Sequence, residues 1–315
     1  MTEPKILYDL DEAAYHADPC DTPSLSASLA HLMVSASPLH AWTASRKLNS
    51  AHESVDTPAF NIGRAFHSLI LDERPRVRVR EEYGDWPDWR SKEARKWRDD
   101  MQEAGEIVLT KAESDALHPM RVNALKTLKS SLDTEPEKLP TEVSLIWEAG
   151  GVTNRARVDA VDVKNRIAVD LKTTAGLADP QLWVAASMDH GIDLRAAHYL
   201  DGLEACFPWH TPFRGSDDPP CPSWRYIFLV VEKSPPHACS LVELDERTIA
   251  MGLSKLMCAR RSWGDCLKLD DWPAWSKAVQ EVSAPEWRVS QWIYDLSEWG
   301  AEIPEILDRD GEIEA

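Results

Sequence analysis

Residues 141–174 read TEVSLIWEAGGVTNRARVDAVDVKNRIAVDLKTT, and this stretch decides the expected fold. Gly150 and Gly151 stand between two runs of strand-forming residues, which is a strong signal for a two-residue β-hairpin turn. Residues 162–166 supply a second turn before the apolar run that starts at Ile167. We therefore predict a meander of three antiparallel strands over this stretch.

The two turns fix which residues of the meander lie opposite each other. The glycine turn places Glu142 opposite Asp159. An even-length second turn, centred on residues 164–165, places Asp159 opposite Asp170. Directly opposed residues share one face of a sheet, and Lys172 shares that face with Asp170 by strand alternation. The register therefore predicts a row of three carboxylates beside one amine.

Such a row is costly, because like charges directly opposite each other destabilise a sheet and burial of acids favours their protonation. A bound divalent cation removes the conflict, since carboxylates are natural ligands of Mg²⁺. The alternative is a solvated face on which Arg155, Arg157 and Lys172 pair with the acids. The spacing alone leaves both interpretations open.

The composition of the whole chain limits the class of protein. The 315 residues include 35 Lys and Arg against 53 Asp and Glu, which gives a formal net charge of −18. This charge excludes a histone-like protein that coats DNA by bulk charge, but it permits a nucleic-acid enzyme with a local basic groove. No apolar run reaches the length of about 18 residues that a membrane span needs, so we expect none. Six cysteines without a disulfide pattern indicate a reduced, cytoplasmic setting.

Segments outside the meander predict the remaining elements of an α/β fold. Residues 61–71, 180–205 and 246–267 are expected to form helices, and residues 224–232 a buried strand. Residues 74–98 contain nine Lys or Arg against five acids, interleaved with tryptophans. This run fits either a DNA path with stacking tryptophans or an exposed amphipathic helix whose tryptophans pack on the protein.

Several motifs together resemble a known nuclease superfamily. Asp159 followed by Asp170-Leu171-Lys172 resembles the PD-(D/E)xK nuclease core, with Asp in place of Glu. Residues 63–67, GRAFH, resemble the G-x-x-x-H motif of RecB-type nucleases. Residues 195–199, RAAHY, stand where that family has Q-x-x-x-Y, with Arg195 in place of Gln. The chain most resembles RecE-type exonucleases (exodeoxyribonuclease VIII-like), over about residues 24–275.

The resemblance implies an α/β fold with a PD-(D/E)xK, restriction-endonuclease-like core, in which helices flank a mixed central sheet. It implies one nuclease domain over residues 1–315. Within this domain we expect a helical N-terminal extension over residues 1–60, a catalytic core over residues 141–205 and an acidic tail over residues 302–315.

The resemblance also assigns roles to side chains, and the register argument adds Glu142 to them. The expected catalytic residues are Lys172, Asp170, Asp159 and Glu142. The expected metal ligands are His67, Asp159, Asp170 and the backbone carbonyl of Leu171. The expected DNA contacts are Arg157, Arg195 and Tyr199, although the alternation of the strand leaves Arg157 equally suited to pair with the acids.

The expected cofactor is Mg²⁺. Imidazole is not a preferred Mg²⁺ ligand, so His67 indicates that Mn²⁺ would also serve. Some RecB-type relatives hold an iron–sulfur cluster on four cysteines. No C-x-x-C pair occurs in this sequence, so we expect no iron–sulfur cluster.

By resemblance, the function is metal-dependent 5′-to-3′ degradation of linear double-stranded DNA, which leaves a 3′ single strand for a RecT-like annealing protein. A ring-shaped homo-oligomer is expected, in the cytoplasm of a bacterium or encoded by a phage. Two alternatives remain. One is an endonuclease or single-strand nuclease of the same fold, and the other is a catalytically silent DNA-binding or DNA-mimicking protein.

Overall fold

The computed structural model of the chain describes residues 3–52, 58–72, 75–132, 138–208, 223–304 and 307. It forms two compact units, Met1–Ala274 and Trp275–Ala315. The sequence analysis treated residues 1–315 as one nuclease domain, and this stays a prediction. All candidate site residues lie in the first unit, and only residues 302–304 and 307 of the predicted acidic tail are described.

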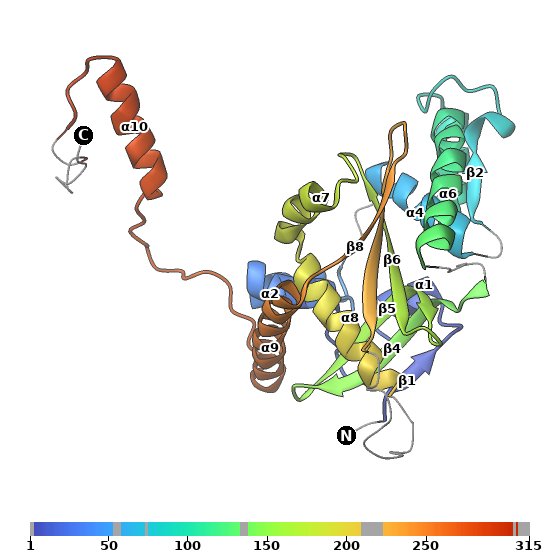
Figure 1. Cartoon of the computed structure of the whole chain (residues 1–315), viewed down its shortest axis with the longest axis horizontal. Coiled ribbons are helices and arrows are strands. Elements are labelled where there is room, and N and C mark those ends of the chain that lie inside the picture. The colour runs from blue at the N-terminus through green and yellow to red at the C-terminus, as the bar shows by residue number, and fades with distance from the viewer. Residues whose placement is uncertain are drawn as a thin grey trace. The chain divides into compact units, whose positions relative to one another are not determined.

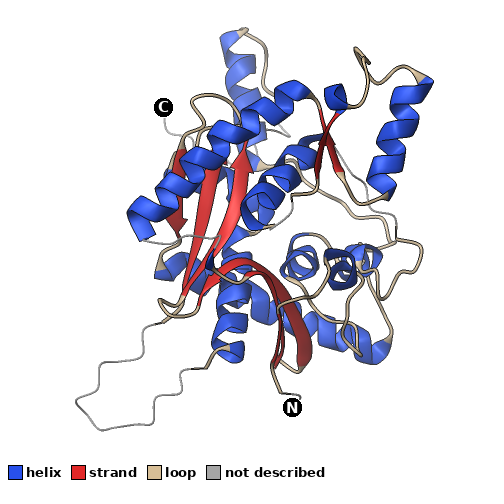
Figure 2. Cartoon of the chain, turned by 90° about the vertical axis from the view of Figure 1, so that its right-hand side faces the viewer, coloured by secondary structure: helices blue, strands red, loops and turns tan. Residues whose placement is uncertain are grey.

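The first unit contains a mixed six-stranded sheet with the strand order β1-β4-β5-β6-β7-β8 (Figure 2). Neighbouring strands are antiparallel, except that β6 and β7 are parallel. The mixed central sheet expected from the sequence is thereby confirmed. The strands are β1 (Lys5–Leu7), β4 (Thr141–Ala149), β5 (Val152–Asp162), β6 (Ile167–Thr174), β7 (Arg225–Glu232) and β8 (Cys239–Glu243).

The predicted meander is formed by β4, β5 and β6. β4 pairs with β5 in the predicted register, which starts at the Ala149↔Val152 pair next to the glycine turn. The turn glycines have φ angles of +62° and +76°. Such angles belong to the type I′ turn, which glycine adopts without steric cost. Local turn chemistry therefore sets the register of this hairpin.

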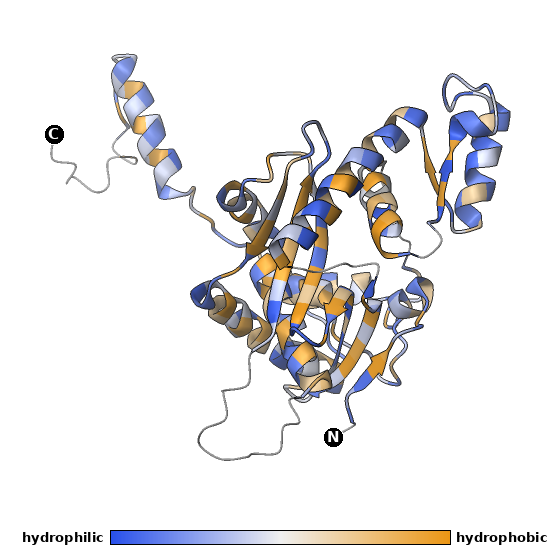
Figure 3. Cartoon of the chain, turned by 45° about the vertical axis from the view of Figure 1, so that its right-hand side comes forward, coloured by the Kyte–Doolittle hydropathy of each residue, from blue (hydrophilic) through white to orange (hydrophobic). Residues whose placement is uncertain are grey.

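Helices cover both faces of the sheet, and apolar positions line the layers between strands and helices (Figures 1 and 3). α4 and α6 pack on one face, over a core that includes Phe66 and Leu171. α7 and α8 pack on the other face, over Trp147 and Phe228. With the short helix η3 they form the crossover that the parallel β6–β7 pair requires. These helices are α4 (Pro58–Leu71), α6 (Lys111–Leu132), α7 (Pro180–Ser187), η3 (Met188–His190) and α8 (Ile192–Cys206).

The N-terminal extension carries helices, as expected, and also an edge strand that the sequence analysis missed. Strand β1 pairs with β4, and its three residues are too few to show a periodic pattern. α2 packs with α8 and α9 around a third cluster of apolar side chains. The helices are α1 (Glu12–His16), α2 (Ala27–Ser35), α3 (Pro38–Ala44) and α9 (Glu246–Leu269).

The described part of the basic run, residues 75–98, forms a short strand, a short helix and the start of a second helix rather than one exposed helix. β2 (Val77–Val79) and β3 (Ile107–Leu109) are parallel, and η1 (Arg80–Glu82) and α5 (Lys92–Glu103) lie between them in the chain. Three aromatic rings of the run, Tyr83, Trp86 and Trp89, pack against Trp97. Several of its basic side chains pair with acids. These contacts favour the interpretation in which the tryptophans pack on the protein.

The second unit contains α10 (Glu286–Glu298). Among the described residues of both units, no helix has the length and apolar character that crossing a membrane requires.

Candidate active site

Strands β5 and β6 separate at the position of the predicted acids. Their ladder keeps the predicted register but ends at the Ala160↔Val169 pair. At the next position the Asp159 carboxylate accepts a hydrogen bond from the backbone N–H of Leu171, at 2.7 Å. A side chain thus takes the place that a main-chain carbonyl has in a regular ladder, while β6 continues beside β7.

Three side chains converge beside this gap. One ligand atom each from His67, Glu142 and Asp159 lies within 4.8 Å of the others. His67 projects from α4, and its Nδ1 lies 3.6 Å from an Asp159 oxygen. Its Nε2 lies 2.8 Å from the carbonyl oxygen of Leu171. The structure thus brings together four of the groups that the sequence analysis assigned to the metal and to catalysis.

Glu142 reaches this cluster through an uncommon backbone conformation. Its φ angle is +54°, which costs a residue with a Cβ atom about 1–2 kcal/mol. The neighbouring residues Thr141 and Val143 both keep regular pairing with β5. The Glu142 carboxylate forms an ion pair with Arg157. Strain of this kind is typical of functional sites, where the surrounding structure holds it in place.

Asp170 lies next to the three-residue cluster and interacts electrostatically with Asp159 and His67. It is buried, and one carboxylate oxygen pairs with the Lys172 ammonium group. The other oxygen, Oδ2, is buried and has no hydrogen-bond partner in the described part of the chain. Asp170 and Lys172 therefore share a side of β6, as strand alternation predicted.

The single row of three carboxylates that the register predicted is not formed, because strand alternation breaks at Asp159. Residues two apart in a regular strand face the same side. Here Val158 packs in the core beneath α8, whereas Ala160 packs in the core beneath α4 and α6. The acids of β4 and β5 therefore turn toward His67, while Asp170 pairs with Lys172.

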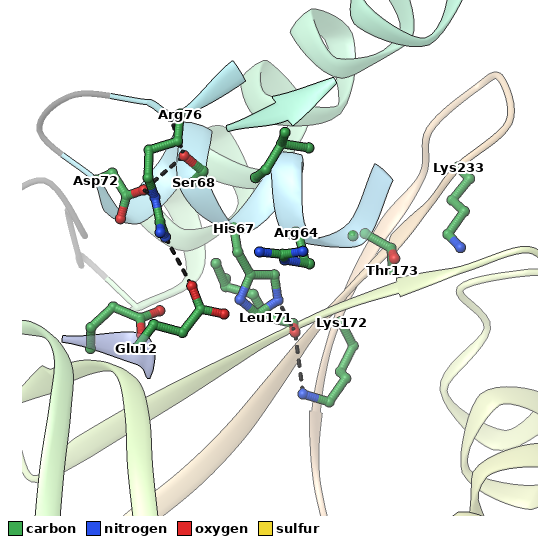
Figure 4. A pocket seen from close by; sticks show the side chains of 13 residues that line it. Glu12, Arg64, His67, Ser68, Asp72, Arg76, Leu171, Lys172, Thr173 and Lys233 are labelled. Atoms are coloured by element: carbon green, nitrogen blue, oxygen red, sulfur yellow. Dashed lines mark hydrogen bonds and ion pairs between the residues drawn. The ribbon is translucent and has the colours of Figure 1, made fainter. Parts of the chain in front are cut away.

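The cluster opens into a pocket of about 440 Å³, whose wall includes Glu142. His67, Leu171 and Lys172 also line this pocket (Figure 4). The wall also contains polar residues that the sequence analysis did not select. These are Glu12, Arg64, Ser68, Asp72, Arg76, Thr173 and Lys233. Glu12 comes from α1 and pairs with Arg76 at 3.1 Å (Figure 4). No sequence spacing could place Glu12 here, because it is far from the motifs along the chain.

Burial and neighbouring charges shift the pKa values of the three acids in different directions. Burial raises the pKa of Glu142 to about 7, and Asp159 adds to this effect while Arg157 opposes it. Burial also raises the pKa of Asp159, although His67 works against it. For Asp170, burial is outweighed by Lys172 and Arg195, which hold the pKa of this carboxyl below its ordinary value. Glu142 and Asp159 therefore lack full compensation by positive charge.

The side chains present fit a divalent cation. Nε2 of His67 donates to the Leu171 carbonyl, and Nδ1, which faces Asp159, would offer its lone pair to a cation in the neutral imidazole. Carboxylate oxygens of Glu142 and Asp159 would complete a set of ligands of the type that Mg²⁺ and Mn²⁺ accept. The buried Oδ2 of Asp170 is a further acceptor with no partner of its own among the described residues.

The family model described as a PDDEXK-like domain of unknown function (DUF3799) matches residues 36–284 of the chain. The chain belongs to this family. The matched DUF3799 region contains every residue that the sequence analysis assigned to the site, from His67 to Tyr199. Membership confirms the PD-(D/E)xK superfamily that the motifs indicated.

A solved structure shares the fold of this DUF3799 protein. A crystal structure described as "Putative exonuclease" from Eubacterium rectale is 14% identical, with a TM-score of 0.52, and covers 92% of this chain and 98% of that chain. A second solved structure, SSO0001, is 15% identical, covers 76% of this chain and 94% of that chain, and has a TM-score of 0.25, so no argument rests on it. No curated protein matches the chain.

The three predicted DNA contacts occupy different places in the DUF3799 fold. Arg157 pairs with Glu142 in the active site, which is one of its two expected roles. Arg195 and Tyr199 both project from α8, and the Arg195 guanidinium lies 6.0 Å from the centre of the Tyr199 ring. They line a second pocket, which shares no lining residue with the catalytic pocket. Contact of these residues with DNA stays a prediction.

Proposed function

We propose that this chain is a divalent-metal-dependent exodeoxyribonuclease that degrades linear double-stranded DNA from 5′ to 3′. The convergence of His67, Glu142 and Asp159 next to the Asp170–Lys172 pair is the observation that carries the proposal. Membership of a PDDEXK-like family supports nuclease chemistry. The order of the motifs, which resembles RecE-type enzymes, supports exonucleolytic action.

The residues of the site have different roles in the proposed phosphodiester hydrolysis. A bound divalent cation supplies an acidified water and neutralises charge on the phosphate. Glu142, Asp159 and His67 would hold that cation. Lys172, fixed by its ion pair with Asp170, directs an ammonium group at the pocket, where it orients the attacking water and stabilises the negative charge on the scissile phosphate.

The proposal includes partners that the RecE resemblance implies. The product is a 3′ single strand, which a RecT-like annealing protein would receive, in the cytoplasm of a bacterium or in a phage-infected cell. The acting form is a ring-shaped homo-oligomer that encloses DNA. Light scattering after gel filtration tests this part, and a chain that stays a monomer at micromolar concentration contradicts it.

Release of acid-soluble nucleotides tests the enzymatic proposal. With Mg²⁺, the wild-type chain should degrade linear duplex and spare covalently closed circles, and a 5′-terminal label should be released before a 3′-terminal label. Asp170→Ala and Lys172→Ala should each lose at least about 100-fold in rate. Lys164→Ala, which changes an exposed lysine in the β5–β6 turn, should keep the wild-type rate.

The alternatives give different results in the same assay. Cutting of closed circles indicates an endonuclease, and preference for unpaired strands indicates a single-strand nuclease. Absence of cleavage with both Mg²⁺ and Mn²⁺ indicates the catalytically silent protein. Equal rates in the wild type and in the folded Lys172→Ala variant contradict the assignment of the site.

A further inference from the structure

A second pocket, which we call the α8 pocket, contains basic side chains and no acid. It has a volume of about 310 Å³. The catalytic pocket mixes acids with bases, as its lining by Glu12, Asp72 and Glu142 shows. None of the thirteen described residues that line the α8 pocket is acidic, in a chain whose net charge is −18. The basic lining residues are His16, Arg46, His52, Arg155 and Arg195.

Several elements that are distant along the chain meet at this pocket. They are α1, the first turn of α2, the segment after α3, strand β5 and helix α8. Aromatic rings support the guanidinium groups, because Arg155 lies 5.6 Å from the Tyr15 ring centre and Arg195 lies 6.0 Å from that of Tyr199. The pocket is therefore a product of tertiary packing and is held by buried residues.

Of its three arginines, only Arg155 forms a direct ion pair with a residue that the structure describes. Arg155 forms an ion pair with the buried Asp18, at 3.0 Å. The guanidinium groups of Arg195 and Arg46 form neither a hydrogen bond nor an ion pair with any residue that the structure describes. Arg195 is half-buried and interacts with Asp170 and Asp159 electrostatically but without a direct contact, so its guanidinium donors are available to a ligand. An anion in the pocket would accept hydrogen bonds from these guanidinium groups.

The neutral groups of the α8 pocket also suit an anion. The hydroxyls of Ser26 and Ser28 line it and can donate hydrogen bonds. The first turn of α2 lines it too, and the N-terminal end of a helix carries partial positive charge. Guanidinium groups match the geometry of phosphate oxygens, to which they can donate two parallel hydrogen bonds.

We infer that the α8 pocket binds a phosphate group of the nucleic-acid strand on which the nuclease acts, outside the scissile position. The inference rests on the proposed function for the identity of the strand. The pocket lies near the catalytic carboxylates, because Arg195, which lines it, interacts electrostatically with Asp170 and Asp159. Its separate lining excludes the scissile phosphate, which Lys172 faces in the catalytic pocket.

Binding measurements in EDTA test this inference without cleavage. Fluorescence anisotropy would follow binding of short duplexes that end in a 5′-phosphate or a 5′-hydroxyl, at salt concentrations from about 50 to 200 mM. Arg46→Ala and Arg195→Gln should each weaken binding about 5- to 10-fold and reduce the slope of log affinity against log salt by about one. Arg247→Ala removes an exposed charge that lines neither pocket, and it should leave binding unchanged.

The two duplexes distinguish the source of the phosphate. If the pocket holds a terminal phosphate, the wild type prefers the 5′-phosphorylated duplex and Arg46→Ala removes the preference. If the pocket holds an internal phosphate, the wild type binds both duplexes equally and Arg46→Ala lowers the salt slope for both. Binding and slope that are unchanged in both folded variants overturn the inference.

Failure of this inference is distinguishable from failure of the proposed function. A wild-type chain that binds as predicted but does not cleave with Mg²⁺ overturns the proposed nuclease activity and leaves the phosphate pocket intact. A chain that cleaves, but whose Arg46→Ala and Arg195→Gln variants bind like the wild type, overturns the phosphate pocket alone.

Discussion

Glu142 combines a left-handed backbone conformation with a carboxyl whose pKa lies near 7, beside a second carboxyl in the same cluster. Both properties lower the stability of the metal-free chain. Arg157 provides one compensating charge. A residue that served only to stabilise the hairpin would have neither property, so the arrangement is typical of a site that is completed by a ligand.

The strain at Glu142 predicts an unusual order of stability for two variants. In a strand, glycine is normally less favourable than alanine. Because glycine has no Cβ atom to oppose a positive φ angle, we expect Glu142→Gly to be more stable than Glu142→Ala by about 1 kcal/mol. Urea denaturation in EDTA measures the difference, and both variants lose the same ion pair. A more stable alanine variant would show that the conformation carries no strain.

The cluster predicts stabilisation by metal ions, with a readout that is independent of cleavage. Mn²⁺ at about 100 times its dissociation constant should raise the free energy of unfolding by about 2.7 kcal/mol, because the ion binds only the folded chain. Thermal unfolding measures the effect. Asp159→Asn should remove most of it, whereas Asp265→Asn, an exposed substitution on α9, should not. Equal shifts in all three chains would place the ion elsewhere.

At the scale of secondary structure, α8 links the sheet to the helices behind it. It packs on β4, β5 and β7 and also against α9, and it presents Arg195 and Tyr199 to the α8 pocket. Gly252 of α9 lies at the closest approach of α8 and α9. A Cβ atom built on Gly252 would lie 2.1 Å from the backbone oxygen of Asp193, at the start of α8. Only glycine permits this helix crossing.

Gly252→Ala should therefore destabilise the chain. The added methyl group meets main-chain atoms, which cannot move aside as a flexible side chain could, so the two helices must shift apart. The expected loss is about 1–3 kcal/mol, despite the better helix propensity of alanine. Thermal or urea unfolding measures it, with the exposed Ser254→Ala on the same helix as control. A variant as stable as the control would mean that the helices do not meet this closely.

At the scale of the whole molecule, acid stability depends on a histidine in the interior. His198 is fully buried between α8 and β5, where its Nε2 lies 3.0 Å from the Arg155 carbonyl oxygen. Burial lowers the pKa of His198 to about 3, from an ordinary value of 6.5. Below about pH 6.5, His198 binds a proton in the unfolded chain but stays neutral in the folded chain until the pH approaches 3. The contribution of His198 to stability is therefore complete above that pH and is lost as the pH falls toward 3.

This linkage predicts how His198→Gln differs from the wild type with pH. The stability advantage of the wild type should shrink by up to about 1.4 kcal/mol per pH unit between pH 6 and pH 4, because glutamine does not titrate. Urea denaturation at several pH values measures it. His190→Gln, which replaces an exposed histidine, serves as the control. A difference between His198→Gln and the wild type that does not change with pH would mean that the histidine is protonated in the folded chain.

The meander and its register could be predicted from the sequence alone, because turn residues and strand alternation act over a few positions. The glycine turn sets the pairing of β4 with β5, and the second turn sets that of β5 with β6. The pairing of Asp170 with Lys172 follows from the same periodicity. His67 was identified only through the resemblance of its motif, since no local pattern links it to residues that lie about 100 positions away.

Only the tertiary structure decided how these groups are finally arranged. At Asp159 the strand alternation breaks, and at Glu142 the backbone is left-handed, where the strands pack between two different cores. Neither feature could be predicted from the neighbouring residues in the sequence. Glu12 joins the catalytic pocket, and Arg46 joins the α8 pocket, because distant segments pack beside the sheet. Contacts between segments far apart in the chain depend on the whole fold, whereas turns and strand periodicity depend on neighbouring residues.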